Sequence, residues 1–470
     1  MLFSSPVFLF LFLPAVLLLH TLAPRAAKNA VLLACSLLFY AWGEFNYSVL
    51  MAAVIAMNHM FGLAVERHRQ HALAGWLLGV CMVANLGLLG YFKYAGFVVD
   101  SGNSVLGWLG FAPLPHPEII LPIGISFYTF QAMSYVIDVA RGAVRAQRNP
   151  IDLALYVALF PQLIAGPIVR YVDVAAELRD RHVGWSGFAS GVQRFCLGLA
   201  KKMLLANSLG GVADIAFGLP DGSLPMTTAW LGIVCYALQI YYDFSGYSDM
   251  AIGLGQMLGF QFLENFNYPY AARSLTDFWR RWHISLSTWF RDYLYIPLGG
   301  NRHGTLRTAA NLLVVFLLCG LWHGASWTFV LWGLFHGVFL SAERCGLGRL
   351  LARLPSLFQH AYLLVAMLVG WVLFRANDLA HAWLYLQAMF GLNSTAADEF
   401  PAAMYLDSGL LIALAIGIAA SVPTQYALTS LAIRAGQRSQ RHAWLSGMAA
   451  NSLAFGRVAM VVCTLLASAS

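Results

Sequence analysis

Residues 276–304 read TDFWRRWHISLSTWFRDYLYIPLGGNRHG (Thr276–Gly304), and after an apolar run the chain continues as CGLWHGASWTFVLWGLFHG (Cys319–Gly337). Only 10% of all residues are charged, yet the first stretch gathers ionisable side chains within sixteen positions. They are Asp277, Arg280, Arg281, His283, Arg291 and Asp292. Ionisable groups at membrane depth are costly and mark functional sites, so these residues predict an active site inside a membrane.

The composition is that of a membrane protein. The chain has 470 residues, of which 60% are hydrophobic, and its mean hydropathy is +0.67. Soluble domains are nearer half apolar and about a quarter charged. We therefore expect an all-α polytopic membrane protein. It should form a single membrane-embedded domain over residues 1–470, with a core at 1–345 and less typical C-terminal helices at 346–470.

Charge and cysteine usage argue against several other classes of protein. The formal net charge of +7 is scattered through loops, whereas nucleic-acid binding requires a clustered basic face. The seven cysteines include no CxxC pair and most lie in apolar runs, which indicates neither a disulfide framework nor a metal site. Cys319, four residues before His323, could be a nucleophile or could serve helix packing alone, and packing is favoured.

Twelve segments are candidates for membrane-crossing helices, which need about 20 mostly apolar residues. They are Val7–Leu22, Ala30–Trp42, Ser48–Val65, Ala74–Tyr94, Ile119–Val139, Phe188–Phe217, Thr227–Tyr242, Leu312–Trp322, Ser326–Leu340, Ala361–Phe374, Leu406–Val422 and Val458–Ala467. With re-entrant segments included, we expect about 11 to 13 membrane helices. The first is interpreted as a retained helix, because Arg25 and Lys28 follow its apolar run instead of preceding it.

The positions of Lys and Arg predict the orientation. Basic residues follow the first, third and fifth spans and are absent after the second and fourth, which places the N-terminus outside. Two apolar stretches, Asp152–Ile168 and Phe278–Leu298, have basic residues on both sides and would break this alternation as crossings. We interpret both as re-entrant segments beside a polar funnel, since irregular backbone at membrane depth requires cover by protein or water.

His323 is the first candidate for chemistry. It falls near the turn between two predicted spans, and the neighbouring Gly324 would let substrate or backbone approach closely. Histidine is the usual general base near neutral pH. The alternative, a structural histidine that bonds a nearby carbonyl, is equally compatible with the residue type alone.

The other histidines are weaker candidates. On a helix, His283 would share a face with Arg280 and Ser287 and could orient a thioester or stabilise an oxyanion. It could equally be an interfacial histidine beside arginines whose heads reach water. At 100° per residue, His336 would point about 220° away from His323 on one helix, which favours a structural role for it, as for His303 in a loop.

Asp243 and Asp249 flank the end of a predicted span in YYDFSGYSDM (Tyr241–Met250). Two acids there could mark a cation or proton path, as in a transporter. Because they are six residues apart and share no helix face, we favour helix caps or partners for nearby arginines. Arg280 and Arg281 could attract the phosphates of an anionic donor from the cytosol.

Several stretches together resemble the membrane-bound O-acyltransferase (MBOAT) family, in particular its alginate O-acetylase-type branch, which acetylates bacterial exopolysaccharides. They are LFSSPVFLFLFLP (Leu2–Pro14), YFKYAGF (Tyr91–Phe97), LPIGISFYTFQAMSY (Leu121–Tyr135), FPQLIAGPIVR (Phe160–Arg170), YYDFSGYSDMAIGLG (Tyr241–Gly255), ENFNYPY (Glu264–Tyr270), FWRRWHISLSTWFRDYLYIPLGGNR (Phe278–Arg302) and GLWHGASW (Gly320–Trp327). The C-terminal third matches less well and is shorter than is typical for an alginate acetylase.

The resemblance implies a fold and a chemistry. The family's invariant histidine corresponds to His323, and its second signature position, Asn or His, falls on His283. A curved helical shell would surround a tunnel open to a cytosolic acyl donor, acetyl-CoA, and to an extracytoplasmic acceptor. We assign the donor site to Arg280, Arg281, Trp282, Ser287 and Trp322.

The resemblance also implies partners and a location. The chain would lie in the bacterial inner membrane as a multi-pass protein, in contact with lipid. It would act with a periplasmic SGNH-like acetyltransferase and a polysaccharide synthase and export complex. The polymer, alginate, cellulose or another glycan, stays open, as does the acceptor, a partner serine or the sugar itself. Two other functions remain: a transporter of acyl donor or glycan without catalysis, and a structural scaffold for a polysaccharide synthase.

Overall fold

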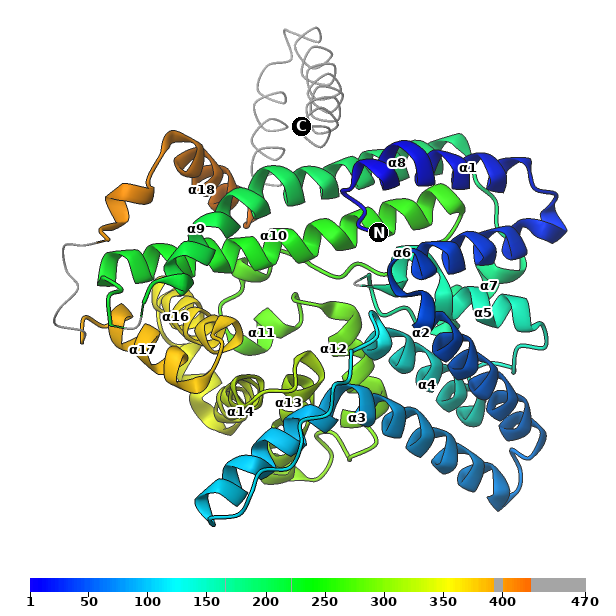
Figure 1. Cartoon of the computed structure of the whole chain (residues 1–470), viewed down its shortest axis with the longest axis horizontal. Coiled ribbons are helices and arrows are strands. Elements are labelled where there is room, and N and C mark those ends of the chain that lie inside the picture. The colour runs from blue at the N-terminus through cyan, green and yellow to red at the C-terminus, as the bar shows by residue number, and fades with distance from the viewer. Residues whose placement is uncertain (165, 221, 393–399, 424–470) are drawn as a thin grey trace, which may run out of the picture. The chain divides into compact units, whose positions relative to one another are not determined.

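A computed structural model describes residues 1–164, 166–220, 222–392 and 400–423 (Figure 1). These residues form helices and loops and contain no β-strand. Four helices are long and apolar enough to cross a membrane, namely Arg25–Arg67, Ala72–Trp108, Gly304–His323 and Ser356–Arg375. The all-α polytopic fold class is confirmed. The expected 11 to 13 membrane helices, the orientation and the single domain over residues 1–470 stay predictions.

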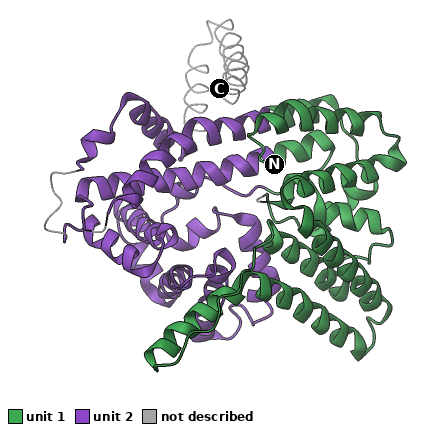
Figure 2. Ribbon diagram, viewed as in Figure 1, with its two compact units in different colours: residues 1–192, 251–263 green, residues 193–250, 264–470 purple. Residues whose placement is uncertain are grey.

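The chain divides into two compact units (Figure 2). Unit 1 comprises residues 1–192 and 251–263, and unit 2 comprises residues 193–250 and 264–470. Helices α8 (Trp185–Ala200) and α10 (Met226–Leu258) contribute residues to both units.

Unit 1 is built around the long helix α2 (Lys28–Arg67), which packs against α3, α4 and α5. A cluster of phenylalanine rings forms its core, with ring centroids 4.9–6.4 Å apart: Phe3, Phe8, Phe12, Phe39 and Phe160. The remaining elements are η1 (Phe8–Phe12), α1 (Leu13–Leu22), η2 (Arg25–Ala27), α3 (Ala72–Trp108), α4 (Ile125–Arg141), α5 (Pro150–Ala158), α6 (Phe160–Leu163) and α7 (Tyr171–Arg179).

The break predicted between Ala30–Trp42 and Ser48–Val65 is confirmed, because α2 consists of two helices that meet in a kink at Glu44, where φ is −142° and ψ is 55°. Other expected boundaries in unit 1 differ from the structure, and the span predicted at Ala74–Tyr94 continues in α3 to Trp108. The helix predicted over Ile119–Val139 starts later, at Ile125, because Pro122 cannot donate a backbone hydrogen bond and Gly124 adopts a left-handed φ of 76°.

Both stretches predicted to be re-entrant consist of short helices. In Asp152–Ile168, α5 ends at Ala158 and α6 starts at Phe160, because Leu159 leaves the helical region before Pro161. In Phe278–Leu298 the backbone breaks at His283. These breaks are the irregular backbone that the sequence predicts, whereas the depth of either stretch in a membrane stays a prediction.

Unit 2 holds most of the motifs singled out above. Its elements are η3 (Lys201–Ala206), α9 (Asn207–Gly218), η4 (Pro269–Ala271), α11 (Leu275–Trp279), α12 (Ile284–Phe290), η5 (Arg291–Tyr295), α13 (Gly304–His323), α14 (Trp327–Ala342), η6 (Glu343–Leu347), α15 (Gly348–Leu351), α16 (Ser356–Arg375), α17 (Leu379–Met389), η7 (Ala402–Tyr405) and α18 (Ser408–Ala420). The span predicted at Val458–Ala467 lies outside the described residues.

The closest helix pair of unit 2 is α13 with α14. Glycines allow this approach, since a Cβ on Gly320 would overlap the Phe329 carbonyl oxygen and one on Gly333 would overlap that of Phe316. Small residues at such contacts are the usual means by which membrane helices pack closely. The pair fixes where α13 ends, and therefore where His323 lies.

Candidate active site

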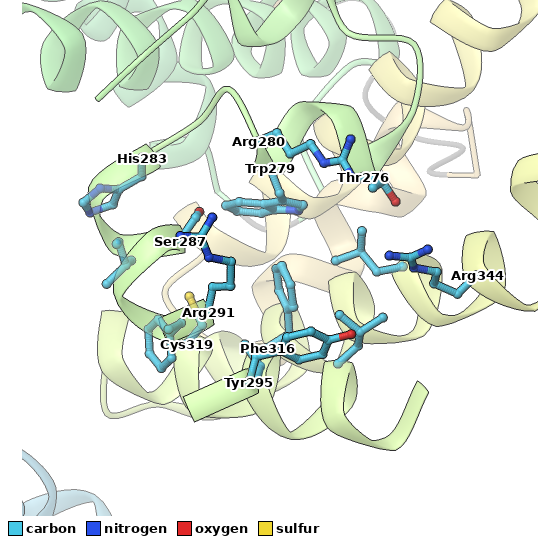
Figure 3. A pocket seen from close by; sticks show the side chains of 15 residues that line it. Thr276, Trp279, Arg280, His283, Ser287, Arg291, Tyr295, Phe316, Cys319 and Arg344 are labelled. Carbon is cyan, nitrogen blue, oxygen red and sulfur yellow. The ribbon is translucent and has the colours of Figure 1, made fainter. Parts of the chain in front are cut away.

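A cavity of about 210 Å³ lies among α11, α12, η5, α13 and η6 of unit 2 (Figure 3). We call it the arginine cavity. It is lined by Thr276, Trp279, Arg280, His283, Leu286, Ser287, Phe290, Arg291, Tyr295, Leu312, Val315, Phe316, Cys319, Leu340 and Arg344. Figure 3 shows Trp279 and Phe316 near its centre, with His283 at one end and Arg344 at the other. The cavity is apolar inside and carries basic groups at its margin.

The arginines of this cavity differ in their partners. Arg291 forms an ion pair with Asp292 at 2.7 Å. Within the described part of the chain, no carboxylate lies within 4.0 Å of the guanidinium of Arg280 or Arg344. Both side chains are exposed. Two uncompensated guanidinium groups beside an apolar chamber suit a ligand with a phosphorylated end and a small uncharged end.

Two of the arginines lie on π-helical segments, Arg291 on η5 and Arg344 on η6. Such segments are rare and occur frequently at functional sites. The buried carboxylate of Glu343, next to Arg344, accepts hydrogen bonds from the backbone N–H of Leu275 (2.8 Å) and Thr276 (3.0 Å). Glu343 therefore ties the start of α11 to η6, at the end of the cavity where Thr276 and Arg344 lie.

His283 has an unusual backbone conformation. The sequence-based premise that it lies on a helix is wrong, because its φ of 45° and ψ of 54° place it in the left-handed region immediately before α12. This conformation costs about 1–3 kcal/mol in a residue with a side chain and is concentrated at active sites. Arg280 and Ser287 nevertheless line the same cavity as His283.

Asn265 holds His283 in this conformation. Its backbone carbonyl accepts the N–H of Ile284 (3.0 Å), and its side-chain Oδ1 accepts the N–H of Ser285 (3.1 Å). A backbone N–H can only donate, so the side-chain atom that faces it is the oxygen. The same Oδ1 lies 3.2 Å from Nδ1 of His283. Nδ1 therefore carries the proton, and Nε2 of the neutral ring is an acceptor.

His323 is the last residue of α13, as the sequence predicts, and it is partly exposed. Its ring makes edge contacts with Trp322, Trp332 and Phe374 at centroid distances of 5.0, 5.2 and 5.1 Å. Gly324 follows because a Cβ there would overlap the Phe329 ring. His323 does not line the arginine cavity.

Trp322 lies between the two candidate histidines. Its ring centroid is 6.1 Å from that of His283 and 5.0 Å from that of His323. The two imidazole rings are therefore within about 11 Å of each other. The expectation that His336 points about 220° away from His323 assumed a single helix and is wrong, because His323 ends α13 and His336 lies in α14. The rings of both histidines contact Trp332.

The residues assigned to the donor site divide between two environments. Arg280 and Ser287 line the arginine cavity. Arg281 does not, and it pairs with Asp277 at 2.9 Å. Trp282 is buried against other aromatic rings and stacks on Phe278 at 5.5 Å. The donor assignment therefore rests on Arg280 and Ser287, while the geometry gives Trp322 a place between the histidines.

A second cavity of unit 2, of about 490 Å³, adjoins the Asn265 side of this site. We call it the ion-pair cavity. It is lined by Arg194, Leu197, Ala200, Lys201, Leu204, Leu205, Tyr241, Tyr242, Ser245, Ser248, Asp249, Glu264, Asn265, Phe266, Tyr268, Ile416 and Ala420. Here Asp249 pairs with Arg194 (2.7 Å) and Lys201 (2.6 Å), and Glu264 pairs with Arg194 (2.6 Å).

Asp243 also has a basic partner, Lys202. The expected arginine partner is present for Asp249, which pairs with Arg194, whereas Asp243 pairs with a lysine; both acids are in ion pairs, which the structure favours over an open cation path. The cavity also contains buried polar atoms without a partner in the described structure, namely Oγ of Ser245, Oγ of Ser248 and Nδ2 of Asn265. Asn265 lines the ion-pair cavity and contacts His283, which lines the arginine cavity, so the two cavities are linked through this pair.

Three residues of the site, Asn265, Glu343 and Arg344, were not predicted from the sequence. Asn265 lies inside the quoted ENFNYPY stretch, but an asparagine in a loop carries no signal of its own. Glu343 and Arg344 follow an apolar run, where an acid beside a base has no distinguishing pattern. Glu343 acts through hydrogen bonds to residues 67 and 68 positions away, which no local pattern reveals.

Comparison with known proteins gives one family match. A model of the family described as MBOAT, membrane-bound O-acyltransferase family, matches residues 35–374. The match includes His283, His323, the arginine cavity and most of the ion-pair cavity.

Individual relatives are similar over most of the chain. The Probable alginate O-acetylase AlgI of Azotobacter vinelandii is 50% identical over 398 residues, covering 83% of this chain and 78% of the relative. The protein of the same name from Pseudomonas aeruginosa is 48% identical over 403 residues, covering 85% and 76%. The Peptidoglycan O-acetyltransferase of Helicobacter pylori is 36% identical over 428 residues, covering 84% and 80%.

Proposed function

The chain belongs to the membrane-bound O-acyltransferase family, and we propose that it takes acetyl from a cytosolic donor and passes it across the inner membrane to a secreted polysaccharide. It is an O-acyltransferase and a multi-pass membrane protein. The observation that carries the finer proposal is the pair of histidines joined by Trp322, one of them on the wall of a cavity with unpaired arginines.

The donor that fits the arginine cavity best is acetyl-CoA. The exposed guanidinium groups of Arg280 and Arg344 suit its phosphates. The chamber beyond them is lined by apolar and aromatic side chains such as Trp279 and Phe316, which suit the uncharged thioester end. A CoA moiety held this way stays outside the bilayer while only the acetyl group moves inward. The proposal needs no metal.

His323 acts as the general base on the acceptor hydroxyl. It removes the proton as the hydroxyl oxygen bonds to the acetyl carbonyl carbon, then returns it to the sulfur as the C–S bond breaks. General-base catalysis of this kind contributes roughly 10²–10⁴-fold. Neutral His283 cannot donate from Nε2 to an oxyanion, so we assign it to orienting the donor, and only its protonated form could stabilise negative charge.

The polymer is proposed from the relatives. Two of the similar proteins are named as alginate O-acetylases and another as a peptidoglycan O-acetyltransferase, so acetylation of a glycan is common to their names. We propose alginate as the first polymer to test, with cellulose as the next. A periplasmic acetyltransferase of the SGNH type would take acetyl from this protein, and a synthase and export complex would supply the polymer.

The deciding experiment replaces His323 by alanine in the full-length chain, expressed with its native partners. The expected result is loss of acetyl ester from the secreted polymer at unchanged protein level. His303→Ala is the matched control, because it lies at the exposed opposite end of α13 and should leave acetylation unchanged. Normal ester content in the His323 variant would remove the enzyme proposal. A transporter that uses the two acids would instead lose function on Asp243→Asn at unchanged protein level, since the ion pair of Asp243 is partly exposed and its loss should not unfold the protein.

A further inference from the structure

A third cavity, of about 580 Å³, lies within unit 1 and plays no part in the proposed reaction. We call it the basic cavity. Its lining residues are Leu17, Leu18, His20, Thr21, Arg25, Lys28, Arg181, His182, Val183, Gly184, Trp185, Phe188 and Met257. They include two arginines, a lysine and two histidines but no aspartate or glutamate.

The cations of this cavity lack carboxylate partners. In the part of the chain that the structure describes, no acid lies within 4.0 Å of the charged nitrogens of Arg25, Lys28 or Arg181. The nearest acid at the rim, Asp180, is exposed and lies 3.8 Å from His182. The cavity therefore has a positive field that its own residues do not neutralise.

Arg181 shows the imbalance most clearly, since it is only partly exposed and all its contacts are neutral. Its Nη1 donates to Oδ1 of Asn29 at 2.5 Å, and its Nη2 lies 3.5 Å from Nε2 of His20. The guanidinium stacks 4.7 Å from the Phe260 ring centroid. Nε has no hydrogen-bond partner among the described residues. Burial lowers the pKa of Arg181 to about 10, so it is charged at neutral pH.

The carboxylate of Asp152 lies on the far side of Asn29 from Arg181 and already has a hydrogen-bond partner. Oδ1 of Asp152 accepts a hydrogen bond from Nδ2 of Asn29 at 2.7 Å, so Asn29 stands between acid and base. Guanidinium groups bind phosphate through parallel N–H···O bonds, and Nε with an adjacent nitrogen is the usual donor pair. Nε of Arg181 is buried, so an anion in the cavity would be held by the uncompensated charge of the guanidinium and not by a bond to Nε.

Apolar groups lie on the same walls as the cations. Leu17 and Leu18 come from the apolar helix Phe8–Leu22, and Phe188 and Met257 add further hydrocarbon. Trp185 is exposed, as is common for tryptophan at a membrane interface. Arg25 and Lys28 follow the apolar helix Phe8–Leu22, at a position that the charge pattern of the sequence predicts to be cytoplasmic, where the membrane surface is anionic.

We propose that the basic cavity binds the phosphate headgroup of an anionic phospholipid, with the acyl chains against the apolar side chains of the same walls. The ligand class is a phosphate monoanion or dianion attached to glycerol and hydrocarbon. We propose a lipid instead of free phosphate because both basic and apolar side chains line the cavity. The site is independent of the acetyl-transfer proposal, because no residue of the arginine cavity contributes to it.

The test measures binding to the delipidated full-length chain in detergent. The three probes are dioctanoyl phosphatidylglycerol, dioctanoyl phosphatidylcholine and glycerol 3-phosphate. We expect saturable binding of phosphatidylglycerol at least tenfold tighter than that of either other probe. Equal affinity for the two lipids would overturn the proposal, and so would glycerol 3-phosphate binding as tightly as phosphatidylglycerol.

Variants locate the site. Arg25→Gln and Lys28→Gln should each weaken phosphatidylglycerol binding about fivefold, the usual effect of one basic residue at an anionic surface. Arg181→Gln should weaken it more, and Arg181→Lys restores the charge if the glutamine variant does not fold. Arg145→Gln is the control, since Arg145 is exposed and does not line the cavity. Unchanged affinity in the Arg25 and Lys28 variants would also overturn the proposal.

Discussion

The arginine cavity and the ion-pair cavity belong to the same unit and are linked by a contact between His283, which lines the first, and Asn265, which lines the second, but their charges are arranged differently. In the ion-pair cavity each of the two basic lining residues pairs with a carboxylate. Arg194 pairs with Asp249 and Glu264, and Lys201 pairs with Asp249. In the arginine cavity, Arg280 and Arg344 have no such partner within the described residues.

This difference separates charges that stabilise the protein from charges that await a ligand. A buried ion pair costs desolvation that only its partner offsets, so removing one member destabilises the fold. An exposed guanidinium without an ion-pair partner keeps its hydration, so it carries no such desolvation cost. Replacing it should therefore not unfold the protein. Variants of the ion-pair cavity should therefore change the stability of the protein, and variants of the arginine cavity should change the binding of the donor.

The largest effect is expected at His283, where the arginine cavity meets Asn265 of the ion-pair cavity. His283→Ala should lower acetyl transfer by at least about 10²-fold, because the donor loses the group that orients it. His283→Asn should retain activity within about tenfold, since asparagine tolerates the left-handed backbone and also forms hydrogen bonds. Transfer rates with saturating donor measure both. An asparagine variant as inactive as alanine would instead assign proton transfer to the imidazole.

The next effect is on stability and belongs to the ion-pair cavity. Asp249→Asn leaves Lys201 without its partner and Arg194 with Glu264 alone, and we expect a loss of about 3 kcal/mol. Thermal unfolding in detergent measures it. Asp243→Asn is the matched control, because Asp243 is 40% exposed and its pair with Lys202 is worth less than about 1 kcal/mol. Equal losses in the two variants would remove the distinction between buried and exposed pairs.

The fold could be anticipated from sequence to the extent that single segments carry their own signal. The composition and the apolar runs predict an all-helical membrane protein, and the order of the predicted spans places His323 near a turn, where α13 ends. The break between the first two spans that follow Arg25 was also predictable, since α2 is kinked at Glu44. The late start of α4 was missed although its cause is local, because Pro122 and the left-handed Gly124 stand inside an apolar run that reads as helix.

The site was only partly predictable for the same reason. Its histidines and Arg280 stand out because ionisable residues are rare in this chain. The residues that hold them do not: Asn265 acts from 18 positions before His283, and Glu343 from 67 positions after Thr276. The left-handed conformation of His283 also contradicts the helix that RRWHISLS favours, since tertiary hydrogen bonds to Asn265 override local preference.

A smaller effect is expected at the unpaired arginines. Arg280→Gln and Arg344→Gln should each raise the KM for acetyl-CoA about fivefold, because each removes one exposed charge near the phosphates, with little change in kcat. The melting temperature should stay within about 1 °C of the parent, since neither side chain has an ion-pair partner to lose. A clear fall in melting temperature with unchanged KM would reverse the roles assigned to the two cavities.

The smallest effect is expected at Ser248, whose hydroxyl is buried in the ion-pair cavity and has no partner in the described structure. Replacing a partnered buried hydroxyl by hydrogen costs about 1 kcal/mol or more, whereas removing an unpartnered one is close to neutral. Ser248→Ala should therefore change the free energy of unfolding by less than about 0.5 kcal/mol. Ser341→Ala is the comparison, because that hydroxyl donates to the Gly337 carbonyl at 2.7 Å. If Ser248→Ala costs more than Ser341→Ala, the Ser248 hydroxyl has a bound partner, and the ion-pair cavity holds a ligand of its own.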